Sequence, residues 1–129
     1  MNDPTTTTAL DRYLELADRL VADPAALAEL GTVFAAGAVV RLHDRDVVGI
    51  EALTEFYRTF AATFEETKHF WNTEVLADGT LRARWAVAGR RTGGAVMAAS
   101  GTEHATVDAC GLITALRNEF EPTGTERSG

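Results

Sequence analysis

Val39–Phe64 reads VVRLHDRDVVGIEALTEFYRTFAATF, and the rest of the chain can be interpreted around this segment. Its hydrophobic pattern predicts a strand, a polar turn, a short returning strand at Val47-Val48 and, after Gly49, a helix over residues 50–64. The large apolar residues of this helix recur at helical spacing on one face: Leu53, Phe56, Tyr57, Phe60 and Phe64. Because such a face must be buried, the segment predicts a helix that packs on a sheet.

Two further helices are expected before this segment. Thr8, with Asp11 three residues later, is suited to cap a helix over residues 9–22, where apolar residues again recur at helical spacing. Asp23-Pro24 is a typical helix start and predicts a second helix over residues 24–36. Gly37 is then expected to end that helix in the left-handed conformation.

The sequence after residue 64 shows the two-residue alternation of strands. Strands are predicted at Val39–Leu42, Thr67–Leu76, Leu81–Ala88, Ala95–Ala99, Thr102–Ala109 and Leu112–Phe120. Asp78-Gly79 indicates a hairpin turn, and Ser100-Gly101 is expected to break a strand. Helices followed by antiparallel strands are typical of the α+β class. We therefore predict a cone-shaped, curved, mainly antiparallel sheet, with three helices from the N-terminal half closing an apolar pocket on its concave face.

Composition narrows the class of protein. The 129 residues fit one domain, expected at 9–121, with flexible ends at 1–8 and 122–129. A net charge of -7 disfavours nucleic acid as a partner. A single cysteine, Cys110, allows no internal disulfide, and no apolar run approaches the ~20 residues that a membrane span needs. With no signal-peptide pattern at its start, the chain is expected to be cytoplasmic and to have no membrane partner.

The order of four motifs gives the chain a resemblance to a known family. They are Phe34-Ala35-x-x-Ala38-Val39-Val40, Val48-Gly49-x-x-Ala52-Leu53-x-x-Phe56-Tyr57, Asp78-Gly79, and Gly111-x-Ile113-x-x-Leu116-Arg117-x-x-Phe120. Over residues 9–121 the chain resembles the nuclear transport factor 2-like superfamily, and within it the SnoaL-like and ketosteroid-isomerase-like branch. The resemblance implies a cone-shaped α+β barrel, commonly dimeric, with a deep pocket. The superfamily holds isomerases, polyketide cyclases and lyases as well as non-catalytic binders, so the fold alone leaves the function open.

The resemblance also implies roles for individual residues. Tyr13 stands where ketosteroid isomerases have a tyrosine that donates to the developing oxyanion, and Tyr57 stands where a second tyrosine supports the first. Glu103 lies near the position of their protonated acid, with His104 as the alternative if the alignment slips by one residue. Their general base aligns with Leu42, which has no acidic group. Steroid-type isomerisation is therefore not implied as it stands.

The candidate catalytic residues each have a structural alternative. Tyr13 and Tyr57 lie on apolar helix faces, where a tyrosine either lines a pocket or belongs to the core. His43 beside Asp44 would suit a general base near neutral pH, but the same residues are also common in a solvated turn. Glu103 would have a raised pKa and donate a hydrogen bond if it faces an apolar pocket, and would be an ordinary surface carboxylate if the register slips.

Further residues are expected to contact a ligand, most of them aromatic. This candidate set is Phe34, Phe56, Phe60, Trp71, Trp85, Asn118 and Phe120. On Thr67–Leu76, His69 and Trp71 share one face, and the sequence leaves open whether that face points into the pocket or outward. Asn118 is expected inside the cone with Leu116, where a buried amide needs a partner.

Neither a metal nor a cofactor is expected. The histidines His43, His69 and His104 do not have the spacing of metal ligands, and there is no glycine-rich phosphate loop.

Taken with the family resemblance, the sequence predicts a homodimeric protein with a pocket for a small hydrophobic molecule. The first function hypothesis is a cofactor-independent isomerase, cyclase or lyase acting on a hydrophobic carbonyl or polyketide-like metabolite by acid–base catalysis. The alternative is a binding or dimerisation module of the same fold without chemistry.

Overall fold

The computed structural model describes residues 7–42 and 45–121, which form three helices and one sheet. The elements in chain order are α1 (Ala9–Ala22), the 3₁₀ helix η1 (Pro24–Thr32), β1 (Phe34–Arg41), β2 (Asp46–Val48), α2 (Ile50–Thr63), β3 (Phe64–Val75), β4 (Leu81–Arg91), β5 (Val96–Val107) and β6 (Ile113–Phe120). The predicted α+β class, with the helices in the N-terminal half, is confirmed.

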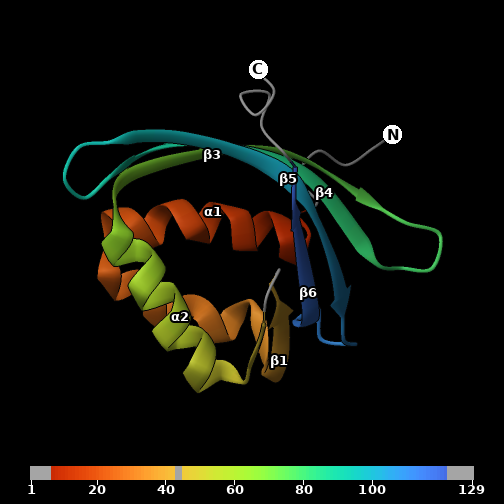
Figure 1. The fold of residues 1–129 in the computed structure, drawn as a ribbon. Helices are drawn as coiled ribbons and strands as arrows, with labels where there is room; N and C mark the ends of the chain where they lie inside the picture. Colours follow the sequence, from red (N-terminus) through yellow and green to blue (C-terminus); the bar gives the residue numbers. More distant parts are fainter. Residues whose placement is uncertain (1–6, 43–44, 122–129) are drawn as a thin grey trace.

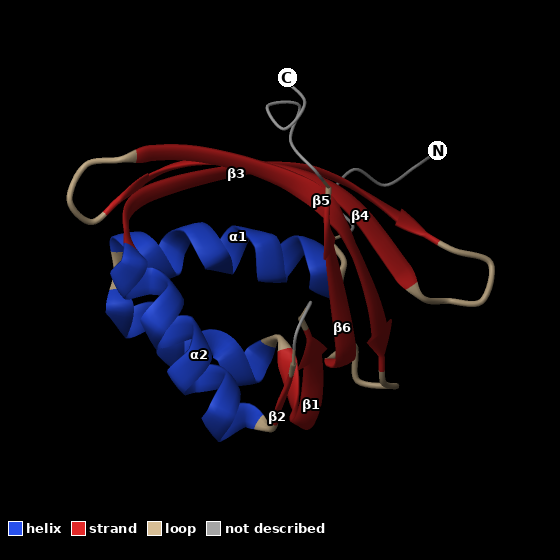
Figure 2. Cartoon of the chain, viewed as in Figure 1, coloured by secondary structure: helices blue, strands red, loops and turns tan. Residues whose placement is uncertain are grey.

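The six strands form one curved sheet in the order β2-β1-β6-β5-β4-β3. All neighbouring pairs are antiparallel except β1 and β6, which run parallel, so the sheet is mixed but mainly antiparallel. Figure 1 shows β3, β4 and β5 arching over α1, with α2 on the same concave side. Figure 2 shows the short hairpin of β1 and β2 beside α2. The sheet remains open, so the predicted cone-shaped arrangement is a curved, unclosed sheet.

Helix α1 begins as its sequence predicts. Thr8 accepts a hydrogen bond from the backbone N–H of Asp11 at 3.1 Å, and the Asp11 carboxylate accepts one from the backbone N–H of Thr8 at 2.9 Å. This reciprocal capping box satisfies two backbone donors that the first turn of a helix leaves without partners.

The prediction of a second helix over residues 24–36 is wrong in its second part. Asp23 caps a 3₁₀ helix that ends at Thr32, and β1 begins at Phe34. The backbone N–H of Ile113 donates to the carbonyl of Val33 at 2.8 Å, and Phe34 pairs with Ile113 in β6. Pairing with this distant strand outweighs the local helical pattern, a tertiary effect that propensity cannot anticipate. Gly37 consequently lies inside β1 with a negative φ, and does not end a helix.

The strands after α2 occur in the predicted order, but their bounds differ. β3 begins at Phe64 instead of Thr67, and β4 continues to Arg91 instead of ending at Ala88. The hairpin at Asp78-Gly79 is confirmed, with Gly79 at a φ of 88°. The predicted break at Ser100-Gly101 is wrong, because β5 continues from Val96 to Val107. Gly101 pairs with Trp85 on one side and Phe120 on the other, and its missing side chain leaves room for the Trp85 indole.

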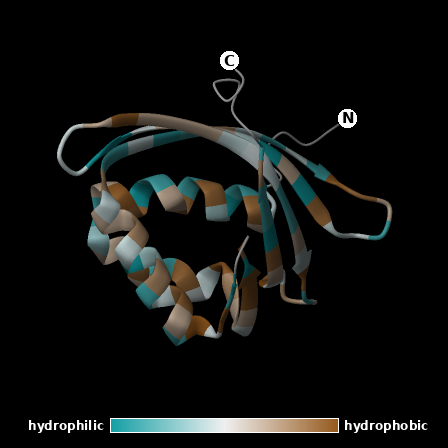
Figure 3. Ribbon diagram, viewed as in Figure 1, coloured by the Kyte–Doolittle hydropathy of each residue, from teal (hydrophilic) through white to brown (hydrophobic). Residues whose placement is uncertain are grey.

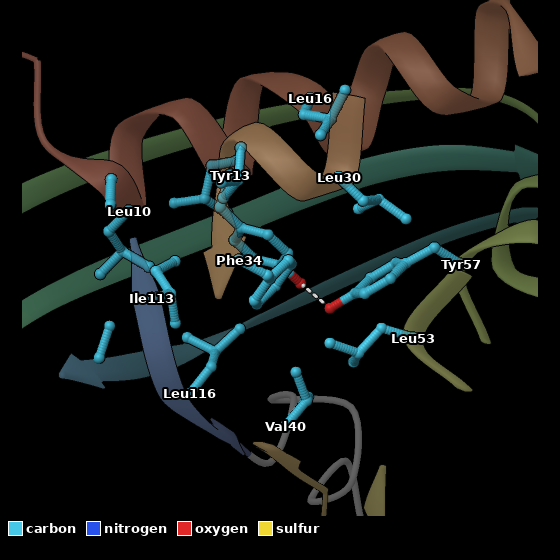
Figure 4. Packing of buried hydrophobic residues seen from close by; sticks show 14 of the residues in the cluster. Leu10, Tyr13, Leu16, Leu30, Phe34, Val40, Leu53, Tyr57, Ile113 and Leu116 are labelled. Atoms are coloured by element: carbon cyan, nitrogen blue, oxygen red, sulfur yellow. Dashed lines mark hydrogen bonds between the residues drawn. The ribbon is translucent and has the colours of Figure 1, made fainter. Parts of the chain in front are cut away.

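The core lies between the concave face of the sheet and the helices. Both α-helices alternate hydrophobic and hydrophilic residues along their length, as Figure 3 shows. The buried side chains interlock in one cluster (Figure 4), and the largest fully buried ones are Phe34, Leu10, Leu14, Leu16, Leu20, Leu30, Leu53, Ile113, Leu116 and Val40. In the part of the chain that the structure describes, none of the helices has the length and apolar character needed to cross a membrane.

Candidate functional site

An apolar cavity of about 300 Å³ lies between α1, α2 and the concave face of the sheet. This volume is at the lower end of the range that small-molecule sites occupy, roughly 300–1,000 Å³. Its lining is mostly aliphatic and aromatic, with a few polar groups: Tyr13, Leu14, Ala17, Val40, Leu42, Phe56, Tyr57, Phe60, Phe64, Thr67, His69, Trp85, Val87, Arg91, Met97, Ala99, Glu103, Leu116, Asn118 and Phe120. The chemistry of the site therefore depends on those few polar groups.

Two tyrosine hydroxyls meet at the cavity. Tyr13 from α1 and Tyr57 from α2 are both buried, and their hydroxyl oxygens lie 2.9 Å apart (Figure 4). Phe34 fixes both rings, packing edge-on against Tyr13 at 5.6 Å and stacking with Tyr57 at 6.1 Å between centroids. Burial raises the pKa of both phenols, that of Tyr13 well above its ordinary value. Both hydroxyls therefore remain protonated at neutral pH and can donate hydrogen bonds.

Glu103 is a carboxyl buried in this apolar cavity. It faces inward from β5, opposite Asn118 on β6, and only 2% of its surface is exposed. No group among the described residues forms a hydrogen bond with its buried Oε1 atom. Burial raises the pKa of Glu103 from 4.5 to about 8, because an apolar environment disfavours the charged form. Of the two orientations that the sequence left open, the structure has the inward one.

His69 lines another part of the cavity and is held by Asp18, which is not itself a lining residue. His69 Nδ1 lies 2.6 Å from Asp18 Oδ1, and the backbone N–H of His69 donates to Asp18 Oδ2 at 2.9 Å. Thr67 also donates to Asp18, at 2.8 Å. Burial alone would raise the pKa of Asp18, but the hydrogen bonds from His69 and Thr67 outweigh burial and lower it. An ionised Asp18 favours the His69 tautomer with hydrogen on Nδ1, which leaves Nε2 as an acceptor.

The other ligand-contact candidates divide into two groups. Phe56, Phe60, Trp85, Asn118 and Phe120 all line the cavity, and Trp85 Nε1 donates to Asn118 Oδ1 at 3.2 Å.

Two of the candidates, Phe34 and Trp71, do not line the cavity. Phe34 lies behind the tyrosine rings, and Trp71 donates from its indole Nε1 to Asp11 Oδ1 at 2.9 Å.

The predicted base His43 and its partner Asp44 fall outside the described residues. Leu42 lines the cavity as an apolar residue. Within residues 7–42 and 45–121, no cluster of His, Cys, Asp or Glu side chains is arranged to hold a metal ion.

Comparison with solved structures identifies the family. An NTF2-like protein of unknown function from Exiguobacterium sp. 255-15 superposes with a TM-score of 0.80 at 31% sequence identity, over 90% of this chain and 100% of that chain. The chain belongs to the nuclear transport factor 2-like family. No protein-family model matches its sequence, and a search of curated proteins gives no match.

Two more distant neighbours of this nuclear transport factor 2-like chain share its fold. A putative SnoaL-like polyketide cyclase from Jannaschia sp. CCS1 has a TM-score of 0.73 at 17% identity, over 94% of this chain and 90% of that one. A Mycobacterium tuberculosis protein in complex with estradiol-17beta-hemisuccinate has a TM-score of 0.72 at 18% identity, over 90% and 95% of the two chains. The predicted resemblance to this superfamily and its SnoaL-like branch is confirmed at the level of fold.

Sequence reasoning missed Asp18 and left open whether His69 points into the pocket or outward. A signal for the pair was nevertheless present. Asp11 and Asp18 are seven residues apart, which places them on one face of α1 two turns apart. The polar residues Thr67, His69, Trp71 and Thr73 alternate along one face of β3, at a comparable spacing. Two aspartates on one helix face and a row of hydrogen-bond donors on one strand face predict that α1 lies along β3. Each aspartate would then accept hydrogen bonds from two neighbouring donors of the row.

Proposed function

We propose that the cavity binds a small, largely hydrophobic carbonyl compound and that the protein moves a proton on it without a cofactor, as an isomerase, cyclase or lyase. One observation carries the proposal: His69, which is hydrogen-bonded to Asp18, lines the same apolar cavity as Tyr13 and the carboxyl of Glu103. A base on one side and hydrogen-bond donors on another are the components that proton abstraction next to a carbonyl needs.

Tyr13 and Glu103 are the proposed donors to the carbonyl oxygen. With a pKa of about 8, the Glu103 carboxyl is mostly protonated at neutral pH and can donate a hydrogen bond. Tyr57 holds the Tyr13 hydroxyl through the 2.9 Å hydrogen bond. Donors that are already aligned in an apolar site stabilise developing negative charge more than water does, because they need little reorganisation.

His69 is the proposed base. Asp18 orients the imidazole and stabilises its charged form after it takes a proton, which is the usual role of a carboxylate behind a catalytic histidine. The sequence favoured a different base, His43 oriented by Asp44, which remains a prediction. The contacts of His69 give it the stronger case, and the experiment below includes both residues.

The experiment measures proton exchange directly and needs no natural substrate. A small cyclic ketone, 2-tetralone, is incubated with the protein in D₂O, and loss of its α-proton signals is followed by NMR. The expected result is exchange above the buffer rate, with a loss of ~10²-fold or more in His69→Gln, the usual scale of general-base catalysis. Tyr13→Phe should lower the rate at least ~10-fold, the effect of losing one aligned donor.

Matched variants make this experiment decisive. His104→Gln removes a histidine that does not line the cavity, and should leave exchange unchanged. His43→Ala tests the base that the sequence favoured. If His69→Gln exchanges protons as fast as the wild type, His69 is not the base, and loss of exchange in His43→Ala would assign that role to His43.

Leu42 favours a second function, ligand binding without catalysis. It lines the cavity at the position where ketosteroid isomerases have their base, and it has no group that takes a proton. In support of binding in general, a neighbour with this fold was crystallised with a steroid hemisuccinate. Saturable binding of 2-naphthol, detected by fluorescence of the cavity residue Trp85, together with no exchange on any ketone tested, would favour this function.

We also propose a homodimer formed through the outer face of the sheet. Phe70 points away from the helices on β3 and is 64% exposed. It pairs in register with Ala86, which in turn pairs with Ser100, so the large aromatic side chain lies beside small residues. An exposed sheet face of this kind can be covered by the same face of a second copy.

A further inference from the structure

The cavity adjoins a wider groove on the surface of the molecule. This outer groove has a volume of about 770 Å³ and lies between Arg45–Val48, one side of α2, and the side chains of Phe64 and Arg91. Four residues line both the cavity and the outer groove: Phe56, Phe60, Phe64 and Arg91. The cavity and the outer groove therefore share a wall made of these three phenylalanines and Arg91.

Two arginines lie over aromatic rings of this groove. The guanidinium carbon of Arg91 is 5.4 Å from the centroid of the Phe64 ring, and that of Arg45 is 5.7 Å from the Phe56 ring. A cation–π contact of this kind favours a position of the guanidinium beside the ring and leaves N–H groups available to bind an anion. Arg91 is at the boundary between cavity and groove, and Arg45 lies further out.

The carboxylates that line the groove are already paired with other cations. Asp46 lies 3.3 Å from Arg41, and Glu55 forms an ion pair with Arg58. Among the described residues, no ion pair includes Arg45 or Arg91. Arg91 therefore presents a guanidinium without a carboxylate partner among the described residues at the boundary of the cavity and the groove, in a chain with a net charge of -7.

We infer that Arg91, assisted by Arg45, binds an anionic group on the ligand, so that the ligand is an amphiphilic carboxylate. Its apolar body fills the cavity, its carbonyl oxygen reaches Tyr13 and Glu103, and its carboxylate lies against the Arg91 guanidinium. A guanidinium suits this group because its two parallel N–H bonds match the two carboxylate oxygens. The inference rests on the proposed function, since it names the class of molecule that the same cavity takes.

The experiment compares two probes of nearly identical shape by titration calorimetry at neutral pH. 6-Hydroxy-2-naphthoate carries an oxygen at one end and a carboxylate at the other, and 6-hydroxy-2-naphthamide replaces the carboxylate by a neutral amide. The wild type should bind the naphthoate at least ~10-fold more tightly, as expected for one charge-assisted bidentate contact. Arg91→Gln should bind both probes equally and keep the naphthamide affinity of the wild type.

Arg84→Gln is the matched control, because it removes the same charge from β4 and lines neither the cavity nor the groove. It should keep the full preference for the naphthoate. Two results overturn the inference while the cavity proposal stands: equal binding of both probes by the wild type, or an unchanged preference in Arg91→Gln. Failure of the wild type to bind either probe at millimolar concentration overturns the inference and the proposed function together.

Discussion

Glu103 shows how one buried residue can serve a site at the expense of stability. Above pH 4.5 the carboxyl is ionised in the unfolded chain, but in the folded protein it keeps its proton up to about pH 8. Folding therefore takes up a proton in this window, and stability falls as the pH rises through it. Natural sites commonly keep such destabilising groups where their chemistry requires them.

Glu103→Gln should therefore stabilise the protein, and the gain should grow with pH. A glutamine has a similar shape and no charge to bury, so little difference is expected near pH 4.5, and a gain on the order of a few kcal/mol is expected above pH 8. Urea unfolding at pH 5, 7 and 9 measures the change. Glu119→Gln, on the neighbouring strand and exposed, is the control. A gain that is constant across these pH values would contradict the buried, protonated state of Glu103.

A substitution at Gly101 tests whether close packing or the backbone freedom of glycine determines the effect on stability. A side chain here would overlap the carbonyl oxygen of Glu119 and approach Trp85 Cζ2 to 2.9 Å. Gly101→Ala should therefore lower the free energy of unfolding by ~1–3 kcal/mol or more, the usual effect of overpacking. Gly37→Ala is the control, since nothing lies within 4 Å of its added carbon. Denaturant midpoints measure the stability of both variants. Equal losses of stability would show that replacing any strand glycine has this effect, and that the close packing around Gly101 is not its cause.

At the scale of elements, α1 and β3 are joined by a row of polar contacts. Asp11 accepts from Trp71 Nε1 at 2.9 Å and from Thr73 Oγ1 at 2.7 Å while it also caps α1. Asp18, two turns further along, accepts from His69 and Thr67. These contacts fix the rotation and translation of α1 against the sheet. The orientation of His69 in the cavity therefore depends on the whole α1–β3 pair.

Asp11→Ala should destabilise the protein by ~2–3 kcal/mol at pH 7, since it removes a helix cap and leaves the Trp71 indole without its acceptor. Burial would raise the pKa of Asp11, but hydrogen bonds from Thr73, Thr8 and Trp71 outweigh it and lower the pKa. A lowered pKa adds stability above the unfolded value near 3.8, and this stability is lost as the pH falls through the folded value. Guanidinium unfolding at pH 7 and pH 3 measures the difference between wild type and variant.

The expected result is a smaller difference at pH 3. Glu15→Gln, on the exposed side of α1, is the control and should have little effect at either pH. An Asp11→Ala variant as stable as Glu15→Gln at pH 7 would mean that the row of polar contacts does not hold α1 in place.

The elements differ in how far the sequence predicts them. The helix after Gly49 and the alternating strand at Leu81 are visible because their patterns are local and long. The early start of β1 at Phe34 is not visible, because it depends on parallel pairing with β6 almost eighty residues later. Gly101 was misread for a related reason: glycine is equally typical of a break and of a close approach, and only the position of Trp85 distinguishes them.

The candidate site was predicted less completely than the fold. Tyr13, Tyr57 and Glu103 could be found because helical period, strand parity and family resemblance agree on them. Asp18 could not be found by inspecting α1 alone, since an acid beside an apolar face is usually solvated. Only its pairing with a row of donors on another element gives it a role.

At the scale of the whole molecule, the helices cover the concave face of the sheet, while no helix of the described chain covers Phe70 on the convex face. The helices and the cavity occupy the concave side, while the convex side of β3 exposes Phe70 next to Ala86. An exposed aromatic residue on a sheet face favours contact with a second copy, because burial removes apolar area from water. In a symmetric pair the same residue occurs twice in the interface, so one substitution changes both sides.

The proposed dimer predicts that Phe70→Glu will convert the protein to a monomer, because two carboxylates would face each other across an apolar contact. Light scattering at tens of micromolar should give twice 13.9 kDa for the wild type and 13.9 kDa for the variant. Val75→Glu is the matched control, since Val75 is also 64% exposed but lies at the end of β3, and it should remain dimeric. The proton exchange of the cavity should persist in the monomer, because every residue of the proposed mechanism comes from one chain. A wild type that scatters as a monomer would rule out the outer sheet face as a dimer contact at this concentration.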